Sequence, residues 1–371
     1  MQAADKLSVL NWDDITLKSR AISHLRVEQA INSPSPTLDD FMAMIAPAGR
    51  KHLETMAVKA QAITRARFGH TISLFAPLYL SNLCANECTY CGFSMSNKLR
   101  RTTLDEQAVL AEIEVLKARG IDNILLVTGE HERKVGMAYF SAMLPVITPH
   151  FRHVAMEVQP LKTAEYLQLR QLGVSTVLVY QETYHRHRYA HYHKHGTKQD
   201  YDWRLHTPDR LGEAQMGKIG LGALLGLSDW RTDSVFTAAH ALALQQAYWR
   251  SRLSISLPRI RPCAGQRDIS QLRGPDDAEL LQLICAYRLL LPAAEISLST
   301  REPAAFRDNV AGIGVTTMSA GSQTEPGGYA AEHDALPQFD TEDNRSVSDI
   351  RHALSRRGLS AVMTDGLQAF A

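Results

Sequence analysis

The stretch LCANECTYCGF, residues 83–93, holds three cysteines close together: Cys84, Cys88 and Cys91. Thiolates are common ligands of iron–sulfur clusters, because soft sulfur suits iron. Three thiolates on one short loop can hold three irons of a cubane cluster, which has four. The fourth iron has no cysteine neighbour in this stretch, so it keeps a position that a small molecule can occupy. The spacing therefore predicts that these cysteines bind a 4Fe-4S cluster with one open iron.

Other uses of the cysteines fit less well. A structural zinc site usually takes four protein ligands, and the next cysteines, Cys263 and Cys285, are distant in sequence. We interpret both as small buried residues. The odd count of five cysteines and the lack of an apolar signal stretch after Met1 argue against disulfides and predict a cytoplasmic protein.

The composition is typical of a large soluble enzyme. With 371 residues, 45% of them hydrophobic, the chain can bury a sizeable core. Its apolar runs fall far short of the roughly 20 residues that cross a membrane. A formal net charge of +1 gives no electrostatic case for nucleic-acid binding. We therefore expect no nucleic acid and no membrane among its partners.

Runs of β-branched and apolar residues alternate with helical patterns along most of the chain. The expected strands are residues 71–80, 123–128, 153–158, 176–181, 219–225, 253–257, 295–299 and 312–318. Such alternation predicts βα units and a parallel sheet. Eight units favour closure, so the predicted fold is α/β, a (β/α)8 TIM-type barrel with catalytic groups just past the strand C-termini. The cluster loop follows the first strand and would lie at this mouth.

The flanking segments have different patterns. Residues 1–70 are predicted to form an N-terminal helical extension, helical from 38 to 68, and residues 71–325 the barrel. Residues 326–371, with a helix at 346–357, are predicted to close the other end of the barrel.

A glycine and several polar residues lie at the ends of the second, third and fourth predicted strands. They are Gly129, Glu130, Glu157, Gln159 and Glu182. Glycine permits close backbone approach, and a carboxylate can accept hydrogen bonds from an ammonium group. Polar groups in an apolar stretch are costly to bury unless they bind something. They either bind a ligand or form turns and hydrogen bonds that seal the barrel.

A histidine-rich segment, residues 185–195, holds five histidines. Alternate histidines can chelate a metal. The segment also carries Arg186, Arg188 and Lys194, which repel a cation. We therefore favour a solvated loop over the barrel mouth.

The C-x3-C-x2-C spacing, with Tyr90 before the last cysteine, resembles that of the radical S-adenosylmethionine superfamily. The resemblance implies that the open iron binds the amine and carboxylate of S-adenosylmethionine, and that Glu130 holds the methionyl amine. It implies further cofactor contacts from Tyr90, Gly129, Glu157, Gln159 and Glu182. Glu157 and Gln159 are candidates for the ribose hydroxyls, with sealing of the barrel as the open alternative.

A closer resemblance covers residues from about 38 to about 322. The segments 84–93, 181–185, 200–205, 222–230 and 258–262 together look like those of the tyrosine lyases of thiamine biosynthesis, the 2-iminoacetate synthases. This implies cleavage of the Cα–Cβ bond of L-tyrosine to 2-iminoacetate and p-cresol, with S-adenosylmethionine split to methionine and 5'-deoxyadenosine. It also implies a thiazole synthase as protein partner and flavodoxin or ferredoxin as reductant.

Related enzymes are the alternatives. The hydrogenase maturase that cleaves tyrosine carries a further C-terminal cysteine motif, whereas no cysteine follows Cys285 here. A biotin-synthase-like enzyme needs ligands for a second cluster, for which two isolated cysteines are too few.

Tyrosine needs a partner for its carboxylate, and a bidentate arginine at a strand end suits this role. Arg301 follows the seventh predicted strand, where related aromatic amino acid lyases place such an arginine. Ser319 and Ser322, after the eighth strand, could add donors. The alternative for Arg301 is an ion pair with Glu302 or Glu295.

Overall fold

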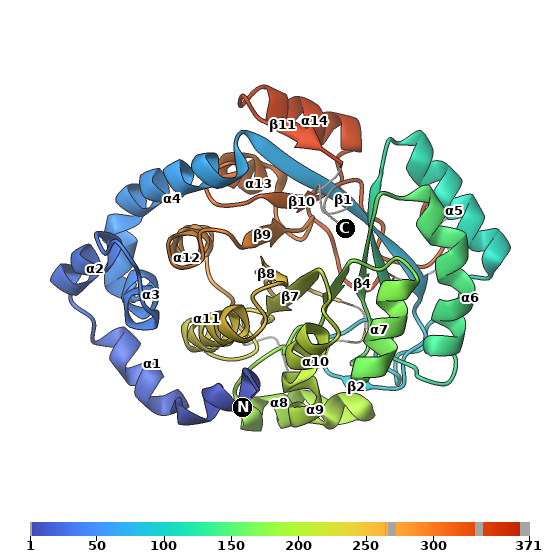
Figure 1. Ribbon diagram of the computed structural model, residues 1–371, viewed down its shortest axis with the longest axis horizontal. Helices are drawn as coiled ribbons and strands as arrows, with labels where there is room; N and C mark the ends of the chain where they lie inside the picture. The colour runs from blue at the N-terminus through green and yellow to red at the C-terminus, as the bar shows by residue number, and fades with distance from the viewer. Residues whose placement is uncertain (1, 264, 266–271, 331–336, 364–371) are drawn as a thin grey trace.

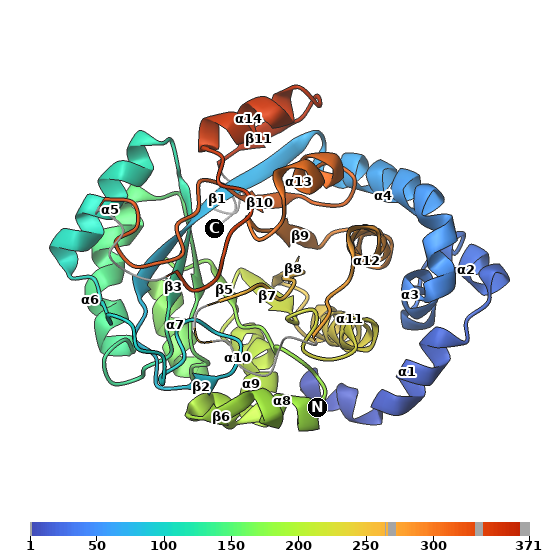
Figure 2. The ribbon, with the colours of Figure 1, turned by 180° about the vertical axis from the view of Figure 1, so that it is seen from behind.

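The computed structural model describes residues 2–263, 265, 272–330 and 337–363. At its centre parallel strands form a closed barrel ringed by helices (Figures 1 and 2). The barrel strands are β1 (Thr71–Ser81), β3 (Asn123–Thr128), β4 (His153–Glu157), β5 (Thr176–Leu178), β7 (Lys218–Gly222), β8 (Arg252–Ser256), β9 (Glu295–Leu298) and β10 (Thr317–Ser319). Pairing of Ser73 with Thr317 joins β1 to β10 and closes the sheet. The predicted eight-stranded barrel is confirmed.

The predicted strands match these positions, and most differences lie at their ends. The last strand was expected from residue 312 but begins at Thr317. Gly312 has a φ of +76°, and a bridge between Ala311 and Val315 closes a turn there. This left-handed backbone is a turn conformation that a strand does not adopt.

Helices on the outside of the barrel connect successive strands. They are α5 (Glu106–Ala118), α6 (Met137–Ile147), α7 (Thr163–Gln171), α10 (Thr207–Glu213), α11 (Trp230–Ala247), α12 (Asp277–Leu290) and α13 (Ala304–Val310). Side chains of Asp105, Asp229 and Asp276 accept backbone N–H bonds at the starts of α5, α11 and α12. These caps fix where each helix begins after its strand.

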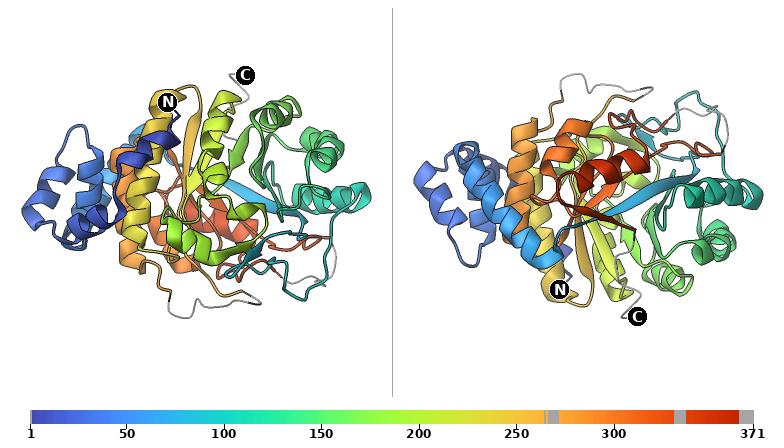
Figure 3. Two further views of the ribbon diagram at one scale, coloured as in Figure 1. Left: turned by 90° about the horizontal axis from the view of Figure 1, so that it is seen from below. Right: turned by 90° about the horizontal axis from the view of Figure 1, so that it is seen from above.

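The N-terminal segment is helical throughout most of its length. It contains the 3-10 helices η1 (Ala4–Val9) and η2 (Pro47–His52) and the helices α1 (Trp12–Arg20), α2 (His24–Ile31), α3 (Leu38–Ile45) and α4 (Leu53–Phe68). Helices α3 and α4 pack on α12, and the whole segment lies on one side of the barrel (Figure 3). Two of these helices, α1 and α2, lie before residue 38, where the sequence pattern did not indicate them.

The C-terminal segment contains α14 (Val347–Ser355) and β11 (Ser360–Val362). β11 pairs in parallel with the first residues of β1, through Thr71 and Ser360. This ninth strand was not predicted. It lies at the end of the barrel where β1 starts, opposite the mouth, whereas residues 337–340 of the same segment reach the mouth. The segment therefore does more than close one end.

No helix in the described parts of the chain is long and apolar enough to cross a bilayer.

A buried ion pair ties the C-terminal segment to the barrel. Arg307 of α13 bonds to Asp343, and both side chains are fully buried. Arg307 also donates to the carbonyl of Ser319 at the end of β10. Arg345 shares the Asp343 carboxylate at 2.8 Å. Burial raises the pKa of Asp343, but the two arginines outweigh it and hold that pKa below its usual range.

We predict that Asp343→Ala lowers the free energy of unfolding by about 3 to 5 kcal/mol, since removing one partner leaves a buried guanidinium uncompensated. Urea denaturation of the cluster-free protein measures this change. Asp202→Ala is the matched control, because it removes a carboxylate from the exposed Arg186–Asp202 pair, which contributes about 1 kcal/mol or less. Equal losses in both variants would contradict the prediction.

Candidate active site

The cluster loop packs against the C-terminal ends of β1 and β3. Strand β2 (Glu87–Cys88), inside the loop, pairs with β6 (His193–His195). Ala85 donates its backbone N–H to the carbonyl of Glu130 at 2.8 Å. A Cβ on Gly129 would lie 2.4 Å from the carbonyl oxygen of Leu83. Gly129 therefore provides the space in which the loop approaches β3, as the glycine at this strand end suggested.

The three loop cysteines line one cavity at the barrel mouth. All three are free of disulfides. Among the described residues, no three His, Cys, Asp or Glu side chains gather tightly enough to hold a single metal ion. A cubane cluster spreads its corner irons, so its ligands lie farther apart than those of one ion. Three thiols on one wall of an open cavity fit a cluster of this kind.

Four charged side chains form a buried group beside the cysteines, here called the charge cluster: Glu130, Glu182, Lys198 and Arg204. Arg204 bonds to Glu130 at 3.0 Å, and Lys198 bonds to Glu182 at 2.7 Å. Their side chains are at most 12% exposed. Burial raises the pKa of both carboxylates, but Lys198 and Arg204 outweigh it and hold each pKa below its usual range. All four groups are therefore charged, and their charges sum to zero.

The charge cluster also positions the cysteine loop. The Asn86 side chain, one residue before β2, donates to Glu130 at 2.8 Å and accepts from the backbone N–H of Lys198 at 3.0 Å. A buried amide with both of its ends bonded is well satisfied. Hydrogen bonds thus connect the charge cluster directly to the cysteine loop.

Glu182 has an unusual backbone conformation. Its φ is +69°, a region that side-chain-bearing residues rarely adopt and that costs of order 1–3 kcal/mol. Asp233 of α11 accepts bonds from Thr183 at 3.0 Å and from the N–H of Tyr184 at 2.7 Å. These bonds hold the following residues so that the Glu182 carboxylate reaches Lys198.

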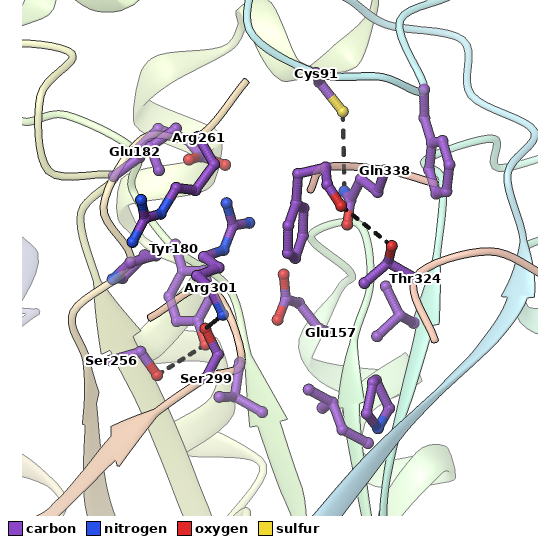
Figure 4. Close-up of a pocket in the computed structure, with 18 of the residues that line it drawn as sticks. Cys91, Glu157, Tyr180, Glu182, Ser256, Arg261, Ser299, Arg301, Thr324 and Gln338 are labelled. Carbon is purple, nitrogen blue, oxygen red and sulfur yellow. Dashed lines mark hydrogen bonds between the residues drawn. The ribbon is translucent and has the colours of Figure 1, made fainter. Parts of the chain in front are cut away.

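The opposite wall of the cavity carries Arg301. Its guanidinium stacks on Phe339, with 3.3 Å between Cζ and the ring centroid. Figure 4 shows it beside Glu157 and Tyr180. Within the described parts of the chain no carboxylate forms an ion pair with Arg301. The burial of Arg301 lowers its pKa.

The two carboxylates that were the alternative partners of Arg301 form ion pairs with other residues. Glu302 pairs with Arg259 and Arg261, and Glu295 pairs with Lys218 at 2.8 Å. The alternative interpretation of Arg301 as a member of these ion pairs is therefore wrong. A buried guanidinium that faces a cavity and forms no ion pair with the described residues suits an anionic ligand.

Ser319, Ser322 and Glu157 also line this cavity. The Ser319 hydroxyl accepts from the N–H of Thr300 at 2.9 Å. The Ser322 hydroxyl is buried without a hydrogen-bond partner among the described residues, so it can serve a ligand. Burial raises the pKa of Glu157 to about 7, although nearby Arg301 opposes the shift.

Two placements differ from the sequence expectations. Gln159 is buried, is absent from the cavity lining, and donates to the carbonyl of Val135 at 2.9 Å. This placement favours the sealing role over a ribose contact, because the side-chain amide is bound to the backbone of residue 135.

The histidine-rich segment is not the expected loop. It forms helix α8 (Arg186–Tyr192) and strand β6. His193 is buried and shares a 2.7 Å hydrogen bond with the hydroxyl of Tyr90. The prediction of a solvated loop was wrong, because β6 pairs with β2 in the cysteine loop. The local sequence pattern does not indicate this long-range pairing.

Sequence reasoning missed Lys198, Arg204, Asn86 and Gln338 as site residues. Lys198 and Arg204 lie in the short helices η4 (Thr197–Gln199) and α9 (Tyr201–Leu205), far in sequence from the carboxylates they meet. A lysine or arginine in a polar segment carries no local signal of burial. Only the resemblance of residues 200–205 to the lyase family pointed to this region.

Comparisons with known proteins agree with this geometry. Residues 78–237 match the model of the radical SAM superfamily, and residues 256–360 match the biotin and thiamin synthesis associated domain. The first region supplies the cysteines and the charge cluster, and the second supplies Arg301 and the residues around it. The fold and site thus define a radical S-adenosylmethionine enzyme, which uses a 4Fe-4S cluster and S-adenosylmethionine.

Two similar sequences identify the family within this superfamily. The chain is 51% identical to 2-iminoacetate synthase of Escherichia coli (strain K12), covering 98% of this chain and 96% of that protein. It is 50% identical to 2-iminoacetate synthase of Salmonella typhimurium, covering 97% and 96%. The chain belongs to the 2-iminoacetate synthase family.

Solved structures show the same architecture. The FeFe-hydrogenase maturase HydG from Carboxydothermus hydrogenoformans aligns with a TM-score of 0.85 at 29% identity, over 98% of this chain and 83% of that one. Methylornithine synthase shares the fold, with a TM-score of 0.74 at 17% identity over 93% of this chain and 99% of that one.

We predict that Glu130→Gln weakens S-adenosylmethionine binding by about 1.5 to 3 kcal/mol, the contribution of a hydrogen bond to a charged group. This corresponds to about a 10- to 150-fold rise in Kd, measured by anaerobic equilibrium dialysis of the cluster-loaded protein. Glu132→Gln, at an exposed position on the same loop, should leave Kd unchanged. An unchanged Kd in Glu130→Gln would limit Glu130 to holding Arg204 and the loop.

Proposed function

We propose that this chain cleaves the Cα–Cβ bond of L-tyrosine to 2-iminoacetate and p-cresol. The observation that carries the proposal is the cavity itself: three cysteines line one wall, and a buried arginine without a carboxylate partner lines the other. Membership of the 2-iminoacetate synthase family supports it. The imine would pass to a thiazole synthase for thiamine, and flavodoxin or ferredoxin would be the reductant.

The protein's own residues would divide the work between the two walls. When bound, the cluster and S-adenosylmethionine would supply radical chemistry that removes a hydrogen atom from the tyrosine amine. Cys84, Cys88 and Cys91 would hold the cluster. Glu130 would bind the methionyl amine, and the rest of the proposed cofactor site consists of Tyr90, Gly129, Glu157 and Glu182.

The charge cluster suits an amino acid headgroup. Its two cations and two carboxylates already neutralise one another, so a zwitterionic ligand can bind without adding net charge. A buried group of this kind would be costly if one charge lacked a partner. We propose that Lys198 and Arg204 face the carboxylate of the methionyl group while Glu130 faces its amine.

Arg301 would bind the tyrosine carboxylate through its planar guanidinium, and Ser319 and Ser322 would add hydroxyl donors. Stacking on Phe339 orients the guanidinium. Tyr79, Tyr180 and Phe339 line the same space and present apolar surface to the phenol ring. A ligand packed against these rings would be shielded from water, as a reactive radical requires.

A maturase-like reaction is the alternative, because HydG is similar in fold. That reaction, as inferred from the sequence resemblance, makes carbon monoxide and cyanide at a second cluster. Residues 286–371 contain no cysteine, so this part of the chain offers no thiolate for such a cluster.

Product analysis tests the proposal. We expect the cluster-loaded protein, reduced and incubated anaerobically with S-adenosylmethionine and tyrosine, to form p-cresol and glyoxylate, the hydrolysis product of 2-iminoacetate, in equal amounts. Stoichiometric cyanide or carbon monoxide would favour the maturase-like reaction instead. Absence of p-cresol under conditions that cleave S-adenosylmethionine would exclude the lyase.

We predict that Arg301→Lys lowers tyrosine-dependent p-cresol formation at least 10-fold, because lysine keeps the charge but loses the two-pronged geometry. Uncoupled cleavage of S-adenosylmethionine without tyrosine should persist, since the cofactor contacts lie on other strands. Arg250→Lys, at an exposed position, is the control. Parallel loss of both activities in Arg301→Lys would assign Arg301 to the cofactor site or scaffold.

A further inference from the structure

A short segment of the C-terminal region lies across the cavity mouth and contacts the cluster loop. The backbone N–H of Gly92 donates to the carbonyl of Gln338 at 3.2 Å, and Gln338 in turn donates its N–H to the carbonyl of Thr324 at 3.0 Å. A Cβ on Gly92 would lie 2.6 Å from that Gln338 carbonyl oxygen. Residue 92 must therefore be glycine for the segment to dock in this way.

The docked segment brings a side-chain amide to a cluster cysteine. The Gln338 Nε2 lies 3.8 Å from Cys91 Sγ, within reach of an N–H···S hydrogen bond. Figure 4 shows this contact among the residues that line the cavity. Cys91 is a predicted cluster ligand, and a thiolate bound to iron can only accept a hydrogen bond. The amide nitrogen, not the oxygen, must therefore face it.

A second contact fixes the amide in this orientation. The hydroxyl of Tyr79, on β1, donates to the Gln338 Oε1 at 2.8 Å. Tyr79 is buried, which leaves its hydroxyl few other partners. With the oxygen occupied by Tyr79, the amide nitrogen of Gln338 is directed toward Cys91. Tyr79, Gln338 and Cys91 are therefore linked by two consecutive hydrogen bonds.

Hydrogen bonds to cluster sulfurs change the reduction potential. Reduction adds an electron, which increases the negative charge on the sulfurs, and a nearby N–H donor stabilises that charge. We propose that Gln338 is a positioning residue that raises the reduction potential of the cluster by donating to Cys91, and that Tyr79 orients it. Gln338 lies far in sequence from the cysteine motif.

The experiment measures the midpoint potential by redox titration followed by electron paramagnetic resonance. Cluster-loaded protein is titrated without S-adenosylmethionine or tyrosine. The inference rests on cluster binding rather than on the lyase activity, so failure of the proposed reaction would leave the measurement valid. The variants are Gln338→Leu, which removes the donor, Gln338→Glu, which replaces the donor by an acceptor, and Tyr79→Phe, which removes the orienting hydroxyl.

We expect the midpoint potential to become more negative in the order Tyr79→Phe, Gln338→Leu and Gln338→Glu, with iron content unchanged because the three thiolates remain. Gln168→Glu, an exposed glutamine of α7, should keep the parent potential.

Two results would overturn the inference. The first is a parent-like potential in both Gln338 variants with full iron content. The second is loss of iron from both Gln338 variants together with a parent-like potential in Tyr79→Phe, because Gln338 would then only hold the loop in place.

Discussion

Docking of the cysteine loop onto the barrel depends on four buried charges that neutralise one another. Arg204 and Lys198 offset the energetic cost of burying the carboxylates of Glu130 and Glu182. Asn86, in the cysteine loop, donates its amide nitrogen to Glu130 and accepts at its amide oxygen from the backbone of Lys198. Removing any one charge leaves the buried group with an uncompensated net charge, which is costly in a low-dielectric site. The position of the cysteine loop therefore depends on the balance of charge in the charge cluster.

The barrel places the cysteine loop and the charge cluster at one wall of the cavity. In a closed parallel barrel all strand C-termini meet at one end, so groups from β1, β3, β4 and β5 face groups from β9 and β10 across a single cavity. The first half of the barrel supplies sulfur and charge, and the second half supplies Arg301 with an open guanidinium.

The C-terminal segment joins the two walls. Gln338 contacts the cysteine loop, and the next residue, Phe339, stacks on Arg301. The same segment is anchored by Asp343, through the buried pair with Arg307. Gln338 and Phe339 are thus consecutive in the chain, although the residues they contact, Cys91 and Arg301, are far apart in sequence.

The sequence by itself determined the parts that depend on local pattern: the cysteine spacing, the eight strands, the N-terminal helices after residue 38, and the polar strand ends that place Glu130 and Arg301 at the mouth. Periodicity and ligand spacing are written in neighbouring residues, so they can be read without coordinates. Only the tertiary structure decided which charges meet. Partners distant in the chain bind Lys198, Arg204, Asn86 and Gln338. Gln159 donates to the carbonyl of Val135 and does not line the cavity. Residues 193–195 form a strand that pairs with the cysteine loop. Long-range contacts and burial have no local signature, because the same lysine or glutamine in the same sequence context could equally face solvent.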